Sequence, residues 1–302
     1  MPPKSAHRSA NLLVSEQLKK NAADLEKALD AHLLTWFGPI QPPVDQLIKN
    51  AVEHRVKQRP RKRTLAVLLQ TGGGYIETAE RMANIFRKHY SRVLFIVPNY
   101  AMSAGTVLVM SGDEIWMNYF STLGPIDPQV ERRDGREGLI PATGYLAKYN
   151  ELVEKSRNGT LTTIEATYLV QNFDPGELFS YEQAQKLSVD LLKTWLVRYK
   201  FRNWKRTRTH RRKVTPAMRK KRAEDIGTHL CDSERWLSHG RGVSMQVLRR
   251  PPLKLEIEDI DGKPDIRDTV GNYYELLDNY LNTIGARGAL HTSDLLLPIS
   301  AA

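Results

Sequence analysis

The chain has 302 residues, 41% of them hydrophobic, which suits one large α/β domain with helical extensions better than two equal domains. Its single cysteine, Cys231, excludes an intrachain disulfide and fits a reducing compartment. The net charge is +11, no stretch approaches the roughly 18 apolar residues of a membrane span, and the N-terminus lacks the roughly 7 to 15 apolar residues typical of a signal peptide. We therefore expect a cytoplasmic protein without a membrane span.

Residues 1–58 are predicted to form a helical N-terminal extension that could brace a neighbouring subunit. Four large apolar residues recur there at helical spacing: Leu25, Leu29, Leu33 and Trp36. The core is expected at residues 59–200. Residues 201–302 are expected to provide a basic helical segment and a C-terminal extension that completes the core.

The first strong motif is a short apolar strand, residues 64–69, followed by three glycines at 72–74 and then a helix. Glycine-rich turns of this kind can bind phosphates, but a P-loop needs Lys followed by Ser or Thr, and here Tyr75 and Ile76 follow the glycines. Glu77 would repel the pyrophosphate of a dinucleotide. Two uses remain, a backbone N–H for an oxyanion or a tight turn that needs a positive φ.

A second strand is predicted at Val93 to Val97, where β-branched and aromatic residues are stopped by Pro98. Ser103 then precedes an apolar helix that begins at Ala104. Free N–H groups and the helix dipole at such an N-terminus favour negative charge, which an acyl-transfer oxyanion needs. Serine is also a common N-cap residue, so a purely structural role is the alternative.

Together these segments predict a strand-helix-strand-helix unit with parallel strands and a right-handed crossover. Ligands gather at the carboxyl ends of the strands in such sheets. The glycine turn and Ser103 both lie at that edge.

Three segments carry a family resemblance: Leu69-Gln-Thr-Gly-Gly-Gly74, Ala101-Met-Ser-Ala-Gly-Thr106 and Ser121-Thr-Leu-Gly-Pro-Ile-Asp-Pro128. They resemble the serine dehydrogenase proteinase family, which is related to signal peptide peptidase A and to the proteolytic subunit of Clp protease. The resemblance covers about residues 60–200 and extends weakly to residues 236–240.

This resemblance implies an α/β fold of the ClpP/crotonase type, with repeated ββα units and helical N- and C-terminal extensions. It also implies that Ser103 is the nucleophile and that the amides of Gly73 and Ala104 form the oxyanion hole. Because relatives build their sites at subunit contacts, it further implies a homo-oligomer.

A serine hydroxyl needs a base, and relatives in this fold use either histidine or lysine. We favour Lys148, which follows the loop at residues 124–125 at about the distance where membrane-associated relatives carry their lysine. Partial burial among apolar neighbours would favour its neutral, basic form. His239 and Lys155 are the alternative bases. Asp127, between two prolines, is expected to fix a turn.

The excess positive charge lies in one run, residues 198–222, which has 13 Lys or Arg and no Asp or Glu. Without it, 32 basic residues face 34 acidic ones. Aromatic residues interleave with these charges, as in proteins that bind single-stranded nucleic acid. The alternative is a helix whose Tyr199 and Trp204 pack inward while the charges are solvated. We favour the second interpretation because relatives carry a similar Asn-Trp stretch.

The remaining elements are less distinctive. Asp174-Pro-Gly176 is predicted to break the helical region at 145–200, and residues 134–138 to form an exposed turn. In residues 253–257, apolar and polar residues alternate as in a strand. In residues 270–283, the apolar residues recur at the spacing of an amphipathic helix. The tail beyond Gly285 is expected to be loose.

These features predict a serine peptidase that acts on peptides or proteins without a metal or cofactor. The alternative from another class is a non-catalytic oligomeric scaffold that binds nucleic acid through residues 198–222. A crotonase-like acyl-CoA enzyme is disfavoured, because that chemistry does not need a nucleophilic serine at the second turn.

Overall fold

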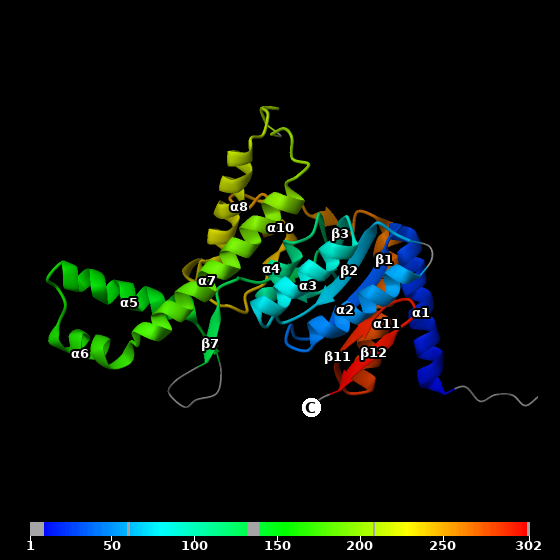
Figure 1. Ribbon diagram of the computed structural model, residues 1–302, viewed down its shortest axis with the longest axis horizontal. Coiled ribbons are helices and arrows are strands. Elements are labelled where there is room, and N and C mark those ends of the chain that lie inside the picture. The colour runs from blue at the N-terminus through cyan, green and yellow to red at the C-terminus, as the bar shows by residue number, and fades with distance from the viewer. Residues whose placement is uncertain (1–8, 59–60, 132–138, 208, 301–302) are drawn as a thin grey trace, which may run out of the picture.

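The computed structural model describes residues 9–58, 61–131, 139–207 and 209–300. Within them, a seven-stranded sheet has the order β10-β5-β3-β2-β1-β11-β12 (Figure 1). Its strands are β1 (His32–Phe37), β2 (Thr64–Gln70), β3 (Arg92–Val97), β5 (Glu114–Met117), β10 (Glu258–Asp259), β11 (Ala286–His291) and β12 (Leu296–Ser300). The strands from β10 to β1 are parallel, whereas β11 and β12 are antiparallel to their neighbours.

Helices cover both faces of the sheet, which explains why its parallel strands are nearly continuous apolar runs. In β2, Leu65, Val67 and Leu69 belong to the core on the side of α2 (Val44–Lys57) and α3 (Ile76–His89). Ala66 and Leu68 face the opposite core, with α1 (Ala10–Leu29) and α11 (Pro264–Thr283). The predicted unit of β2, α3, β3 and the helix after Ser103 is confirmed.

A small three-stranded sheet lies beyond the carboxyl ends of the main strands and positions the candidate site. It contains β4 (Tyr100–Ala101), β6 (Thr122–Leu123) and β9 (Val243–Ser244), with β6 in the middle. Helix α4 (Ala104–Val109) follows β4 after a two-residue turn.

A helical arm, made of α5 (Ala142–Arg157) and α6 (Thr163–Asn172), extends away from the sheet (Figure 1). The chain returns through α7 (Pro175–Trp195), whose N-cap Asp174 confirms the predicted helix break. The π-helical segment η1 (Leu196–Lys200) and α8 (Pro216–Cys231) follow. The remaining elements are short: β7 (Gln129–Glu131), β8 (Leu139–Pro141), α9 (Ser233–Trp236) and α10 (Met245–Arg249). Across the described residues, every helix is too short or too polar to span a bilayer.

The expectation of a wholly helical N-terminal segment was wrong, because residues 32–37 form β1 in the middle of the main sheet. Helix α1 ends at Leu29, and Asp30 adopts a left-handed conformation with φ 47°. Leu33 and Trp36 continue the spacing of the helical apolar residues by coincidence, but they point to opposite faces of the sheet.

The C-terminal expectations also need correction. The tail beyond Gly285 is ordered as β11 and β12, with Pro298 on the edge strand, where a missing N–H is tolerated. Residues 253–257 are no strand, because Lys254 has φ 44°, although Leu253, Leu255 and Ile257 are buried as their alternation suggested. The amphipathic helix predicted at 270–283 is confirmed and begins earlier, at Pro264. The turn predicted at residues 134–138 lies outside the described residues.

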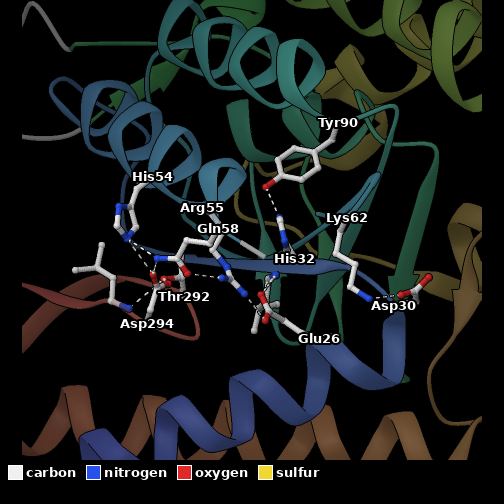
Figure 2. A network of polar contacts seen from close by, with 12 residues as sticks. Glu26, Asp30, His32, His54, Arg55, Gln58, Lys62, Tyr90, Thr292 and Asp294 are labelled. Atoms are coloured by element: carbon white, nitrogen blue, oxygen red, sulfur yellow. Dashed lines mark hydrogen bonds and ion pairs between the residues drawn. The ribbon is translucent and has the colours of Figure 1, made fainter. Parts of the chain in front are cut away.

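A polar network ties the N-terminal elements to the end of the chain (Figure 2). Glu26 of α1 pairs with Arg55 of α2 at 2.6 Å, and its other oxygen accepts the N–H of Leu33 at 2.8 Å. Asp294, in the turn between β11 and β12, accepts from Gln58 at 2.9 Å. These contacts hold α1, α2, β1 and the last two strands together.

Candidate active site

Ser103 occupies the N-cap position of α4 in an unusual backbone conformation, with φ 50° and ψ −119°. A positive φ is costly for a residue with a side chain and is common at functional turns. Its hydroxyl does not cap the helix, and it has no hydrogen-bond partner among the residues that the structure describes. The capping alternative therefore does not explain this serine.

The glycine turn is fastened to the strand that leads to Ser103. Thr71 donates its N–H to the carbonyl of Tyr100 at 3.1 Å and accepts from the N–H of Met102 at 2.9 Å. On the other side, the carbonyl of Gly73 accepts from Ile40 at 2.8 Å. Two sets of backbone hydrogen bonds thus fix the turn beside the serine.

Gly73 is the residue of this turn that lies against Ser103. It has φ +104°, and a Cβ there would lie 2.8 Å from the Ser103 Cβ and 2.9 Å from the Met102 carbonyl oxygen. The same position is 3.5 Å from the backbone nitrogen of Ala104. The structure therefore brings Gly73, Ser103 and Ala104 together at the sheet edge that the sequence predicted.

The two candidate oxyanion amides differ in their present partners. Ala104 is the first residue of α4, where an amide has no carbonyl one turn earlier to bond. The N–H of Gly73 donates to the hydroxyl of Thr71 at 3.1 Å. A ligand oxygen between these amides would replace the Thr71 hydroxyl.

His239 and Asp127 form a pair that the sequence analysis missed. His239 Nδ1 lies 2.9 Å from Asp127 Oδ1, and the Asp127 residue is 1% exposed. With Nδ1 donating to the carboxylate, a neutral imidazole carries its lone pair on Nε2. The signal for Asp127 in the sequence was a carboxylate between Pro125 and Pro128, which we interpreted as a turn.

The small sheet brings this pair to the Ser103 end of the fold. β6 lies between β4 and β9. Ser103 follows β4, Asp127 follows β6 and His239 precedes β9, so all three residues lie close to the ends of this small sheet. Thr106 of α4 accepts from the N–H of Gly124 at 2.8 Å, which ties the helix after Ser103 to the loop before Asp127. A Cβ on Gly124 would lie 2.8 Å from the Met102 sulfur, so this loop lies directly against the residue before the serine.

The two lysines considered as bases lie on the helical arm. Lys148 is exposed and lies 2.9 Å from the carboxylate of Glu151, so the partial burial expected for it is not seen. Lys155 pairs with Glu165 at 2.6 Å, and this hydrogen bond, together with one to Glu151, raises the pKa of Lys155. The contacts of Lys155 therefore favour its charged ammonium form.

A cavity of about 500 Å³ opens beside the glycine turn. Gly72 and Gly73 line it on one side, and residues of β1, α11 and β11 line the other. Asp278 and Arg287 place charges of both signs on its wall. Among the described residues, no group of three or more His, Cys, Asp or Glu side chains is placed to hold a metal ion.

The basic run divides into two parts. Tyr199 and Phe201 pack against the main core, and Arg87 lies over the Tyr199 ring at 3.7 Å. Trp204 packs against Phe201, with ring centroids 5.6 Å apart. The inward packing expected for Tyr199 is thus confirmed, whereas Trp204 is half-buried and packs on Phe201. The run does not continue as one helix, because η1 ends at Lys200 and α8 begins at Pro216.

Comparisons with known proteins found relatives in sequence and in structure. Two uncharacterized proteins of Methanocaldococcus jannaschii are 29% identical over 133 residues and 33% identical over 141 residues. Each alignment covers 44% of this chain, and 43% and 47% of the two relatives, so the chain spans less than half the length of either relative. A solved structure of a serine-to-alanine mutant of a membrane-bound stomatin-specific protease matches with a TM-score of 0.31 and 17% identity, over 51% of this chain and 81% of that one.

The family comparison covers the glycine turn, Ser103 and Asp127. Residues 40–150 match the family described as ClpP-like SDH-type serine proteinase. The mixed α/β fold with a ClpP-like domain and helical terminal regions, expected from the sequence, is therefore confirmed. By this match, residues 40–150 are similar to the ClpP-like SDH-type serine proteinase family.

Proposed function

We propose that this chain is a serine peptidase in which Ser103 attacks the carbonyl carbon of a peptide bond. The observation that carries the proposal is the strained Ser103 at the start of α4, with Gly73 packed against it and its hydroxyl left without a partner in the described structure. This arrangement places a nucleophile next to amide N–H groups that can donate hydrogen bonds to an oxyanion.

The reaction follows from these positions. As the Ser103 oxygen bonds to the carbonyl carbon, its proton passes to the base, and the N–H groups of Gly73 and Ala104 donate to the developing oxyanion. The tetrahedral intermediate then collapses, the amine leaves with the proton, and an acyl-serine remains. Water repeats the sequence with the same base, which releases the acid and restores Ser103.

We propose His239 as the base, oriented by Asp127. The pair supplies a buried carboxylate, an imidazole held through Nδ1 and a basic Nε2. Asp127 follows β6, which pairs with the strand before Ser103, and His239 precedes β9, which pairs with β6 on its other side. The final contact between Nε2 and the serine would form when substrate binds, since such bonds are often loose in unliganded sites. Lys148, with Lys155 behind it, remains the rival, supplied by this chain or by a neighbouring subunit.

The proposed substrate is a peptide or protein whose side chain enters the cavity beside Gly73. The acidic Asp278 and the basic Arg287 on the cavity wall would both contact it. We also propose a homo-oligomer that works in the cytoplasm, where the single buried Cys231 stays reduced.

A fluorophosphonate probe tests the nucleophile, because it phosphonylates an activated serine and the adduct can be mapped by mass spectrometry. We expect one adduct, on Ser103, and none in Ser103→Ala. Ser238→Ala is the matched control, since Ser238 is exposed and lies in the loop next to His239. Labelling of another residue, or equal labelling of Ser103→Ala, would overturn the proposal.

A further inference from the structure

A basic loop projects from the fold at a distance from the candidate active site. We call residues 205–207 and 209–213 the basic tip; they lie between η1 and α8, and they rise above α8 at the top of Figure 1. Arg206 and Lys213 form an antiparallel bridge, and the N–H of Val214 donates to the carbonyl of Lys205 at 2.9 Å. A single antiparallel bridge therefore closes the base of the tip.

The cations of the tip are exposed and have no acidic partner in the described structure. Five exposed basic residues share this property: Lys205, Arg206, Arg211, Arg212 and Lys213. Cations on either side of the tip are engaged by the protein, because Arg202 pairs with Asp113 at 2.9 Å and Lys221 lies 3.6 Å from Asp225. The sequence from 205 to 213 contains six Lys or Arg, and like charges this close repel one another, a repulsion that a bound anion would relieve.

The chemistry of the tip favours phosphate groups on a polymer. Three of the five cations are arginines, whose planar guanidinium groups bind phosphate oxygens in pairs. A segment that enters a lipid surface also presents apolar side chains. In the described structure, the exposed large hydrophobic residue nearest to the tip in sequence is Met218, on α8. The tip itself therefore does not present the apolar side chains that a lipid surface would take up.

The packing of the nearby aromatic residues favours a duplex over a single strand. Single-strand binding draws on exposed aromatic rings for base stacking, and here Phe201 and Trp204 pack on each other at the base of the loop. A duplex presents its phosphates to bound cations without any stacking of its bases on the protein. We propose that the basic tip binds the phosphate backbone of double-stranded nucleic acid without reading its sequence.

Fluorescence anisotropy with a labelled mixed-sequence DNA duplex of about 20 base pairs tests this proposal. The test variant replaces Arg211, Arg212 and Lys213 with Gln. The matched control replaces three exposed lysines on α1 and α3 with Gln: Lys20, Lys27 and Lys88. Both variants lose the same net charge, so only the position of the charge differs.

We expect the wild type and the control to bind with a logarithmic salt slope of about −4 to −5, about −0.9 for each neutralised phosphate. The tip variant should lose at least about tenfold in affinity at low salt, and its slope should be shallower by about 2 to 3. A second variant, Lys205→Gln with Arg206→Gln, should give an intermediate loss. Circular dichroism of each variant checks that the fold is kept.

Three results would overturn the proposal. The first is absence of duplex binding by the wild type at low salt, and the second is equal weakening by the tip variant and the control. The third is tip-dependent binding only to a single strand or to vesicles of phosphatidylserine and phosphatidylcholine. Because Ser103 labelling does not depend on the tip, these outcomes are separate from those that test the peptidase.

Discussion

His239 and Asp127 are 112 positions apart in the sequence, yet His239 Nδ1 lies 2.9 Å from Asp127 Oδ1. The pairing of β6 with β9 produces this proximity, since Asp127 follows the first strand and His239 precedes the second. An imidazole held by a buried carboxylate is the arrangement that a serine nucleophile needs from its base. Because of this pair, we expect His239 to be the base that activates Ser103.

The first prediction ranks the candidate bases. We expect His239→Ala to lower the rate constant of fluorophosphonate labelling at Ser103 by about two orders of magnitude or more. Lys148→Ala should change it less than about threefold, because Lys148 is exposed and paired with Glu151. The opposite ranking would assign the base to Lys148. Small effects from both variants would point to Lys155 or to a neighbouring subunit.

The second prediction concerns Asp127. Asp127→Asn keeps the size of the side chain but removes the charge that holds the His239 tautomer, so labelling of Ser103 should fall by about three to four orders of magnitude. The control is Asp225→Asn, on the exposed side of α8, which should label at the wild-type rate. If Asp127 only fixed a turn, its Asn variant would lose thermal stability and label normally once folded.

The third prediction separates two neighbouring glycines. Gly73→Ala would place a methyl group 2.8 Å from the Ser103 Cβ at a φ of +104°, so the turn would have to move away from the serine. We expect labelling to slow by about 100-fold or more, the loss typical of one oxyanion donor. Gly72→Ala has open space and should behave as wild type. Normal labelling of a folded Gly73→Ala variant would remove this turn from the site.

Local sequence was enough to predict Ser103 as the candidate nucleophile, because a strand, a glycine turn and a serine before an apolar helix all lie within about 40 residues of each other. Local sequence could not predict the Asp127–His239 pair, because this contact depends on the pairing of strands from distant segments. Strand β1 was missed for a different reason. Leu33 and Trp36 fit a helical period and a strand period equally well, and only the left-handed Asp30 marks the end of α1.

The fourth prediction tests the network in Figure 2. The side chains of Glu26 and Arg55 are each 12% exposed, so Arg55→Met would leave a nearly buried carboxylate without its cation. We expect a loss of about 3 to 5 kcal/mol in the free energy of unfolding, measured by urea denaturation. Adding Glu26→Gln should recover much of this loss, since Gln still accepts the N–H of Leu33. Equal stability of the single and double variants would show that the ion pair contributes little.

The last prediction is a pH dependence of stability that originates at His291. Burial lowers the pKa of His291 from 6.5 to about 4, with a smaller contribution from the positive charge of Lys19, while Asp294 acts in the opposite direction. Between these two pH values the unfolded chain binds a proton at this residue and the native chain does not. The free energy of unfolding therefore falls as the pH drops from 6.5 toward 4, and this residue adds no further loss below pH 4.

The side chain packs against Tyr273, whose hydroxyl bonds to His291 Nδ1 and to Thr35, so a variant must keep a polar partner there. His291→Gln supplies one without titrating. From pH 7.5 to pH 5, we expect wild type to lose about 2 kcal/mol more than His291→Gln in urea denaturation. His210→Gln, at an exposed histidine, should follow the wild-type curve. Parallel curves for wild type and His291→Gln would show that His291 is protonated in the native state as readily as in the unfolded chain.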